Sequence, residues 1–333
     1  MKQNKSGMIL LASSVAFLIL IIDSKTSLNA AKEGIALCLH TVIPSLFPFF
    51  VISSLLNASL QGRTYKMLSG ISCICRIPQG TETIFFIGLT GGYPVGALSV
   101  KQAYESKAIV KNEAERMLGF CNNPGPAFLF GITGAMFQSV WIPFLLYFIV
   151  ISSAIITGRI LPGGSNRICS IPKHSATSPL KQSIKAMAQV CAWVVLFRVL
   201  LAFLDKWIFW LFPHWLVTIL SGMLELTNGC LSMNRLENEA LQFIIAAFLM
   251  TFGGLCVGMQ TISVAGNLSC KYYYIGKTIQ CVTAVSLAIP VSIFLFPGNI
   301  PYPYILTAAI PIFGSLAGKL TRNTTGNYLA HGV

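Results

Sequence analysis

The sequence predicts an all-α membrane protein that crosses the bilayer several times, and three observations lead to this prediction. Of the 333 residues, 54% are hydrophobic and only 10% are charged, whereas soluble domains carry about 25% charged residues. The apolar residues gather in long runs, and a helix needs about 20 such residues to cross a bilayer. The net charge of +13 comes from basic residues between these runs. This distribution follows the positive-inside rule and argues against a nucleic-acid-binding domain.

The ten cysteines and four histidines form no pattern typical of a metal site. Cys73 and Cys75 are the closest cysteine pair, and the single residue between them is not a zinc spacing. We therefore expect free, mostly buried thiols and neither a metal ion nor another cofactor. The sequence contains no His-Glu-x-x-His, Gly-x-Ser-x-Gly or Walker-type glycine loop. We therefore expect neither enzyme activity nor ATP-driven transport by this chain alone.

Residues 1–160 form the N-terminal membrane half, which we expect to begin in the cytoplasm and to hold the first of two gate-like repeats. Pro44 and Pro48 lie in its second apolar run and should kink that helix. The kink serves either helix packing or the lining of a binding site. Residues 101–116 carry charges of both signs and are expected to form a surface helix. The expected spans are residues 8–22, 35–56, 119–138 and 140–158.

Residues 84–100 are apolar, yet they contain a run that a regular helix does not accommodate. Gly88 to Ala97 includes repeated glycines and a proline, and these residues bend the backbone and remove a hydrogen-bond donor. Such a break frees polar backbone groups, which a membrane protein tolerates only where they are buried or reached by water. We predict a re-entrant hairpin that enters from the cytoplasmic side. Its expected substrate-binding residues are Gly91, Gly92, Tyr93, Pro94 and Gly96.

A second break opens the span 119–138, where two asparagines precede Pro-Gly-Pro. This run cannot continue a regular helix, and asparagine side chains can both donate and accept hydrogen bonds. The run is either part of the substrate site or a polar turn at the membrane surface. Its candidate binding residues are Asn122, Asn123, Pro124 and Gly125.

A basic stretch without acidic residues separates the two halves. Five residues between Arg159 and Lys185 are Lys or Arg, which places this stretch in the cytoplasm. We take residues 161–182 as the linker and residues 183–333 as the C-terminal membrane half with the second gate-like repeat. About eight spans are expected in total, returning the C-terminus to the cytoplasm. The spans of the second half are residues 186–204, 241–269, 278–296 and 305–317.

The second half also contains polar groups and breaks within apolar sequence. Arg198 lies inside a span, where a charge is costly, so it should face the substrate, pair with Glu225 or reach an interface. Residues 216–229 are too short to span and should form a second re-entrant segment from the outer side. Their candidate binding residues are Glu225, Thr227, Asn228 and Gly229.

A glycine pattern relates the two halves. Gly253 and Gly254 begin a copy of the Gly-Gly-x-x-Val-Gly pattern that starts at Gly91. Paired breaks of this kind predict an inverted repeat around a substrate site near the bilayer midplane. Whether each glycine segment is re-entrant or spanning stays open, since the first was predicted as a hairpin and the second as a crossing. Gly253, Gly254 and Gln260 complete the candidate binding residues.

Taken together, these motifs resemble the YlbJ family of sporulation integral membrane proteins. That family belongs to the nucleoside-recognition, or gate-domain, group, which is related to concentrative nucleoside transporters. The resemblance covers nearly the whole chain and implies export of dipicolinic acid across the outer membrane of the forespore during sporulation. A nucleoside-type transporter and a sporulation scaffold without transport activity are the alternatives. The motifs lie in residues 43–50, 91–97, 122–128, 225–229 and 252–260.

Glu225 distinguishes the two candidate solutes. Dipicolinate is a planar dianion, which the donors of half-helix N-termini and amides would bind. Tyr93 would either stack on its ring or donate its hydroxyl to it. An ionised Glu225 would repel this dianion, whereas it would accept hydrogen bonds from the sugar hydroxyls of a nucleoside. The expected partners are the solute and the lipid bilayer but no nucleic acid, and self-association into a homo-oligomer is left open.

Overall fold

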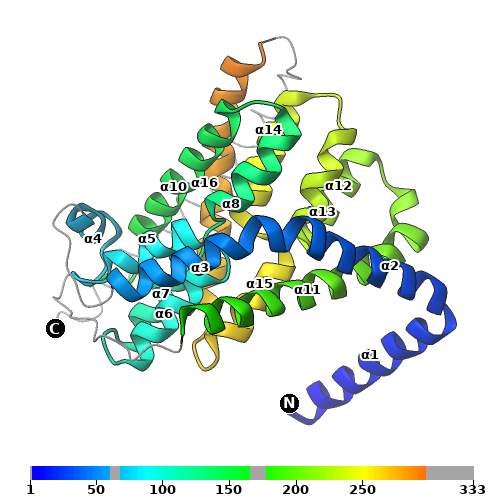
Figure 1. Cartoon of the computed structure of the whole chain (residues 1–333), viewed down its shortest axis with the longest axis horizontal. Helices are drawn as coiled ribbons and strands as arrows, with labels where there is room; N and C mark the ends of the chain where they lie inside the picture. Colours follow the sequence, from blue (N-terminus) through cyan, green and yellow to red (C-terminus); the bar gives the residue numbers. More distant parts are fainter. Residues whose placement is uncertain (1, 61–67, 166–177, 298–333) are drawn as a thin grey trace, which may run out of the picture.

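The computed structural model describes residues 2–60, 68–165 and 178–297, and these residues form helices joined by short turns, with no strand among them (Figure 1). The all-α prediction is confirmed. Five helical segments are long and apolar enough to cross a membrane, so a multi-pass membrane protein is also supported. These candidate spans are Ser24–Leu56, Trp141–Ile160, Ser183–Trp207, Glu239–Ala265 and Lys271–Leu295.

Two long apolar segments lie side by side and connect the halves (Figure 1). One consists of α2 (Ser24–Leu37), a π-helical turn (Cys38–Val42) and α3 (Ile43–Leu60). The other is α11 (Pro179–Trp207). Asp23 forms an ion pair with Lys206 at one end of the two segments. At the other end the Ser54 and Ser183 hydroxyl oxygens lie 3.1 Å apart, so the two segments run antiparallel. The first helix, α1 (Lys2–Ile22), projects away from the bundle (Figure 1).

Each half contains a short helical hairpin. In the first half, α5 (Glu82–Gly91) turns at Gly92 and returns as α6 (Val95–Glu105). In the second half, α12 (His214–Leu224) turns at Glu225 and returns as α13 (Leu226–Ser232). Glycines bring the arms of the second hairpin together, because a Cβ on Gly229 would lie 2.1 Å from the Gly222 Cα. Both apolar segments predicted as re-entrant are therefore hairpins.

Each half also contains one helix that is interrupted midway. α7 (Lys111–Cys121) breaks before α8 (Pro126–Phe128), which leads through a π-helical turn (Leu129–Thr133) into α9 (Gly134–Phe137). α14 (Glu239–Phe252) breaks before α15 (Gly254–Ala265).

The two broken helices run antiparallel through the centre of the bundle. The Ser269 amide, just beyond α15, donates to Glu115 near the start of α7. At the opposite ends, the ring of Phe137 lies 6.4 Å from that of Phe243. A straight helix follows each of them, α10 (Trp141–Ile160) and α16 (Lys271–Leu295).

The order of hairpin, broken helix and straight helix thus occurs twice, and it changes how the glycine pattern is interpreted. Gly91 and Gly92 lie at a hairpin tip, whereas Gly253 and Gly254 interrupt a crossing helix. By element order, the hairpin of Gly92 corresponds to the hairpin of Glu225. The Asn122 break corresponds to the Gly253 break. The Gly-Gly-x-x-Val-Gly pattern therefore does not mark equivalent positions.

Two expectations for individual segments differ from the structure. The predicted span 119–138 is only the second part of a broken helix that already begins at Lys111. The predicted surface helix 101–116 is instead the end of α6 and the start of α7, and Glu113, Glu115 and Arg116 are buried. The predicted last span, residues 305–317, lies outside the described residues.

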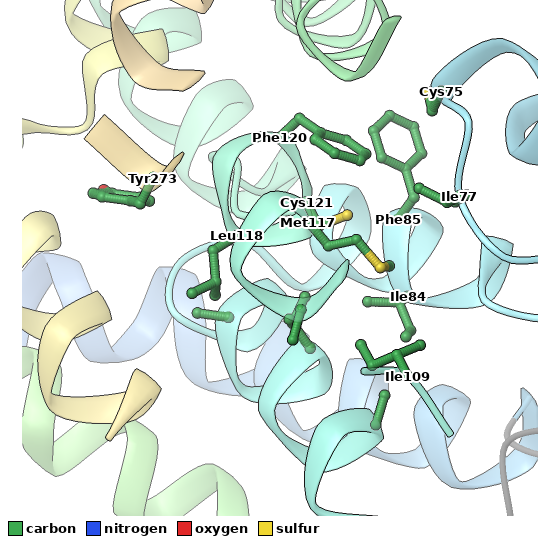
Figure 2. Close-up of a cluster of buried hydrophobic side chains, with 14 of the residues drawn as sticks. Cys75, Ile77, Ile84, Phe85, Ile109, Met117, Leu118, Phe120, Cys121 and Tyr273 are labelled. Atoms are coloured by element: carbon green, nitrogen blue, oxygen red, sulfur yellow. The ribbon is translucent and has the colours of Figure 1, made fainter. Parts of the chain in front are cut away.

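Packing around α7 explains why its charges are buried. Figure 2 shows Met117 and Phe120 of α7 packed against Ile84 and Phe85 of α5. On another side of α7, the Arg116 guanidinium donates to the backbone carbonyls of a short helix, α4 (Ser69–Cys75), its C-cap and the end of α10. The buried guanidinium needs these acceptors, because a buried charge without hydrogen-bond partners is costly.

Candidate functional site

A narrow, mostly apolar cavity, partly open to the surface, lies where the two halves meet. The first hairpin tip, the Asn122 break, the turn at Glu225 and α15 all contribute to its wall, as do α3 and α11. Phe49 and Phe50, which follow Pro48 in α3, also line the cavity. The polar side chains of the lining are Thr41, Ser45, Thr90, Tyr93, Glu225, Thr227 and Gln260.

The tip of the first hairpin is fixed by both broken helices. Gly92 has φ +73°, and a Cβ there would lie 2.8 Å from the amide nitrogen of Gly125, so no larger residue fits. The Tyr93 hydroxyl donates to the Met250 carbonyl at 3.0 Å, just before the Gly253 break. The hydroxyl proposed for the substrate is thus engaged by the other half, while the Tyr93 side chain still lines the cavity.

Glu225 accepts hydrogen bonds from the backbone amides that open the second arm of the second hairpin. Its carboxylate accepts hydrogen bonds from the backbone amides of Thr227 at 3.0 Å and Asn228 at 2.8 Å, and from the Asn228 side chain at 2.8 Å. These amides open α13, where the first backbone donors have no partner within the helix. Glu225 is therefore the N-cap of α13 as well as the acidic group of the cavity lining.

Arg198 does not pair with Glu225. Its guanidinium donates to the Asn228 side-chain oxygen at 2.9 Å and to the carboxylate of Glu33 on α2 at 2.7 Å. Asn228 thus stands between Arg198 and Glu225 and hydrogen-bonds to both. The expected pairing with Glu225 is replaced by an ion pair with Glu33, which joins α11 to α2.

The two asparagines of the first break are engaged within the protein. Asn122 donates to Thr261 on α15 at 2.9 Å and accepts from the Ala97 amide at 3.3 Å. Asn123 donates to the Phe120 carbonyl at 2.8 Å and accepts from the Gln280 side chain at 2.7 Å. Both side chains are fully buried. In this structure they join the first break to the second half, and neither lines the cavity.

The sequence analysis missed Lys277, which lies at the centre of this network. Its ammonium is fully buried and donates to the Asn122 carbonyl at 2.7 Å and to Gln280 at 2.9 Å. The expected span of residues 278–296 does not include Lys277. In the structure α16 begins at Lys271. A Lys and a Gln three residues apart on one helical face were the available signal.

A second, basic cavity lies next to the first. Lys101 of α6 and Lys181 and Lys185 of α11 line it, and none of the described residues in its wall is acidic. The two cavities follow each other along α11, from Gln189 in the basic cavity to Val190 in the apolar one. Tyr93 faces the apolar cavity and the neighbouring Pro94 the basic one, so the first hairpin tip separates them.

The predicted binding residues are thus divided between the cavities and the scaffold behind them. Gly91, Gly92, Tyr93, Gly125, Glu225, Thr227 and Gln260 line the apolar cavity. Pro94 lines the basic cavity. The remaining predicted residues do not line either one: Gly96, Asn122, Asn123, Pro124, Asn228, Gly229, Gly253 and Gly254. Within the described part of the chain, no three His, Cys, Asp or Glu side chains group as a metal site would require.

Comparison with known proteins agrees with this architecture. The chain is 26% identical over 341 residues to the sporulation integral membrane protein YlbJ of Bacillus subtilis (strain 168), covering 85% of this chain and 82% of that protein. No family model matches the chain, and no solved structure matches it. The similarity to YlbJ extends over most of both sequences, and the apolar helices fit an integral membrane protein. This similarity supports the resemblance to the YlbJ family of sporulation integral membrane proteins that the motifs indicate.

Proposed function

We propose that the protein is a transporter or channel that moves a small polar or anionic solute across a membrane, without enzymatic chemistry. The observation that carries this proposal is the pair of cavities in series along α11, separated by the tip of the first hairpin. A solute would enter the basic cavity, pass the hairpin tip at Tyr93 and Pro94, and bind in the apolar cavity. A scaffold whose breaks serve only helix packing would not require this arrangement.

The arrangement of broken helices supports an inverted repeat around the apolar cavity. The broken helices run antiparallel, and each hairpin tip packs against the break of its own half: Gly92 against Gly125, and Gly222 against Gly254. Interrupted helices of this kind surround the substrate in many secondary transporters, which work by moving one repeat against the other. We propose the same relationship here, with the first hairpin as the moving gate.

Dipicolinate is our first candidate for the solute, because of the family resemblance and the charge of the basic cavity. Lys101, Lys181 and Lys185 would raise the local concentration of a dianion at the mouth of the path. Its planar aromatic ring suits the apolar walls of the inner cavity. On this basis we place the protein in the outer forespore membrane, with the basic cavity toward the mother-cell cytoplasm.

A nucleoside is the second candidate, and Glu225 favours it. Glu225 is the one charged side chain among the described residues that line the apolar cavity. The hydroxyls of Thr41, Ser45 and Thr90 lie in the same wall, and with Glu225 they offer partners for sugar hydroxyls. A dianion would pass this carboxylate only if Glu225 were protonated or its charge offset by Asn228 and the adjoining helix N-terminus.

The deciding experiment measures uptake of labelled dipicolinate and labelled uridine into proteoliposomes that contain the purified protein. If dipicolinate is the solute, Glu225→Gln should raise its apparent affinity, since a repelling charge is removed. If a nucleoside is the solute, the same change should weaken uridine binding about tenfold. Glu237→Gln, an exposed acid outside the cavities, is the matched control. Absence of flux for both solutes at normal protein abundance would favour the scaffold.

Membrane orientation is tested separately by cysteine labelling. We expect a cysteine at position 165, in a variant where the exposed Cys73 is replaced by Ser, to be protected from an impermeant reagent added outside sealed cells. Position 173 and the C-terminus, which lie outside the described residues, should behave in the same way. Strong labelling from outside would reverse the proposed orientation.

A further inference from the structure

The ammonium of Lys277 lies in a cage of oxygen atoms at the break of the first broken helix. Its hydrogen-bond acceptors are the Asn122 carbonyl at 2.7 Å, the Gln280 side-chain oxygen at 2.9 Å and the Tyr93 hydroxyl at 3.4 Å. The ring of Tyr93 lies 5.1 Å and that of Tyr273 6.0 Å from the same nitrogen. No ion pair with a carboxylate accompanies Lys277 in the described part of the chain, so the charge is balanced by dipoles and aromatic rings alone.

This set of partners is chemically that of a monovalent cation site. The Asn122 carbonyl is free because the helix ends there, and it lies at the negative end of the α7 dipole. Carbonyl, amide and hydroxyl oxygens are the hard ligands that metal cations prefer. In transporters with interrupted helices, unwound backbone carbonyls and the C-terminal ends of half-helices bind the coupling cation. Here the same kinds of oxygens surround the protein's own ammonium.

The cage also connects the moving parts of the proposed gate. The Tyr93 hydroxyl, which lies 3.4 Å from the Lys277 ammonium, belongs to the tip of the first hairpin. Gln280, one turn further along α16, donates to Asn123 at 2.7 Å and accepts from Lys277, so the lysine, the break and α16 form one network. A charge at this position therefore stabilises contacts among the hairpin tip, the first break and α16. A buried charge is costly in a membrane protein and is retained where it has a role.

We infer that Lys277 is a tethered cation, which permanently occupies the position where a free Na⁺ would otherwise bind at the first break. This inference rests on the proposed transport function and adds that the protein does not couple solute movement to Na⁺. The first hairpin is held by a group that stays covalently attached in every step of the cycle. Removing the ammonium should open a site that small external cations can fill.

The test measures thermal unfolding of the purified full-length protein in detergent, at constant ionic strength, with Na⁺, K⁺ or choline as the salt cation. We expect the Tm of the wild type to be the same in all three. Lys277→Ala should lower the Tm by roughly 10 °C in choline, because it leaves buried oxygens without a partner. Na⁺ or n-propylammonium, which replaces the deleted part of the side chain, should restore at least half of that loss.

Three controls make the test specific. n-Propanol has the shape of n-propylammonium without its charge, so it should not raise the Tm of Lys277→Ala. Lys277→Met fills the space with an apolar chain, so its lowered Tm should not respond to Na⁺ or n-propylammonium. Lys271→Ala removes an exposed lysine at the start of the same helix and should leave the Tm unchanged.

Two outcomes would overturn the inference, and neither depends on the transport assay. A wild-type Tm that rises in Na⁺ relative to choline would show that the protein still binds a free cation. A folded Lys277→Ala protein that no cation stabilises would show that the cage is not a cation site. If Lys277→Ala does not fold, comparing the wild-type Tm in Na⁺ and in choline still shows whether the protein binds a free cation. Cation rescue without any solute flux would support the tethered cation and contradict the proposed transport.

Discussion

The two halves of the molecule interrupt their helices near the same cavity, but they satisfy the freed backbone groups with opposite charges. At the first break the free group is a carbonyl, that of Asn122, and the ammonium of Lys277 donates to it. At the second hairpin the free groups are amides, those of Thr227 and Asn228, and the carboxylate of Glu225 accepts from them. Each charge matches the end of the helix that it meets.

This difference has a consequence for the site. Lys277 lies behind Tyr93 and outside the cavity lining, whereas Glu225 is part of that lining. In the proposed function, the positive charge would stabilise the gate and the negative charge would face the solute.

The largest effect is expected from Gly92→Val, which should abolish solute flux while the protein stays in the membrane. Gly92 has φ +73°, and its Cβ would collide with the Gly125 amide at 2.8 Å, so valine would push the hairpin tip off the break. Gly163→Val is the control, because Gly163 also has a positive φ, +82°, but no neighbour within 4 Å. Normal flux in proteoliposomes at equal abundance would remove the first hairpin from the path.

Glu225→Ala should be the most destabilising change in the second half. It leaves the first amides of α13 buried without an acceptor, which costs about 2–4 kcal/mol and should lower the Tm by roughly 5–10 °C. Glu225→Gln keeps one side-chain oxygen at the same place, so its Tm should fall by about half as much as that of Glu225→Ala. If Ala and Gln leave the Tm equal to that of the wild type, Glu225 is not the cap of α13.

Asn123→Ala and Asn228→Ala compare the amides of the two halves directly. Each side chain bridges two partners, Phe120 and Gln280 for Asn123, and Glu225 and Arg198 for Asn228. We expect each variant to lose about 1–3 kcal/mol of stability and to weaken apparent solute affinity about tenfold through the altered gate. Asn57→Ala, near the end of α3, is the control. A hundredfold loss of affinity at unchanged Tm would instead indicate direct donation to the solute.

The smallest effect is expected from Arg198→Gln. The Arg198 and Glu33 side chains are 30% and 60% exposed, so their ion pair should contribute less than about 1 kcal/mol. The difference in Tm between variant and wild type should also shrink in high salt, because salt screens exposed charges. A loss as large as that of Glu225→Ala would mean that Arg198 supports the second hairpin through Asn228.

The all-α membrane architecture and the places where its helices break could be predicted from local sequence. Apolar runs of span length, and glycine, proline or asparagine inside them, are local signals, since each depends only on neighbouring residues. The hairpins at Gly92 and Glu225 and the interruptions at Asn122 and Gly253 were all predicted in this way. Five of the expected spans also have counterparts among the long apolar helices, although a total of eight is not confirmed.

Which breaks correspond, and which polar groups line the cavities, could be learned from the folded structure but not from the sequence. The two copies of the glycine pattern lie in elements that do not correspond, a hairpin and a crossing helix. A short motif carries no information about the direction in which its helix runs. Asn122 and Asn123 are candidate substrate ligands by sequence, but they hydrogen-bond to Thr261 and Gln280 in the other half of the chain. Lys277 lies outside the expected span 278–296, yet it is buried. Its burial depends on oxygens that folding brings together from distant segments, and hydropathy measures only the residues next to it along the chain.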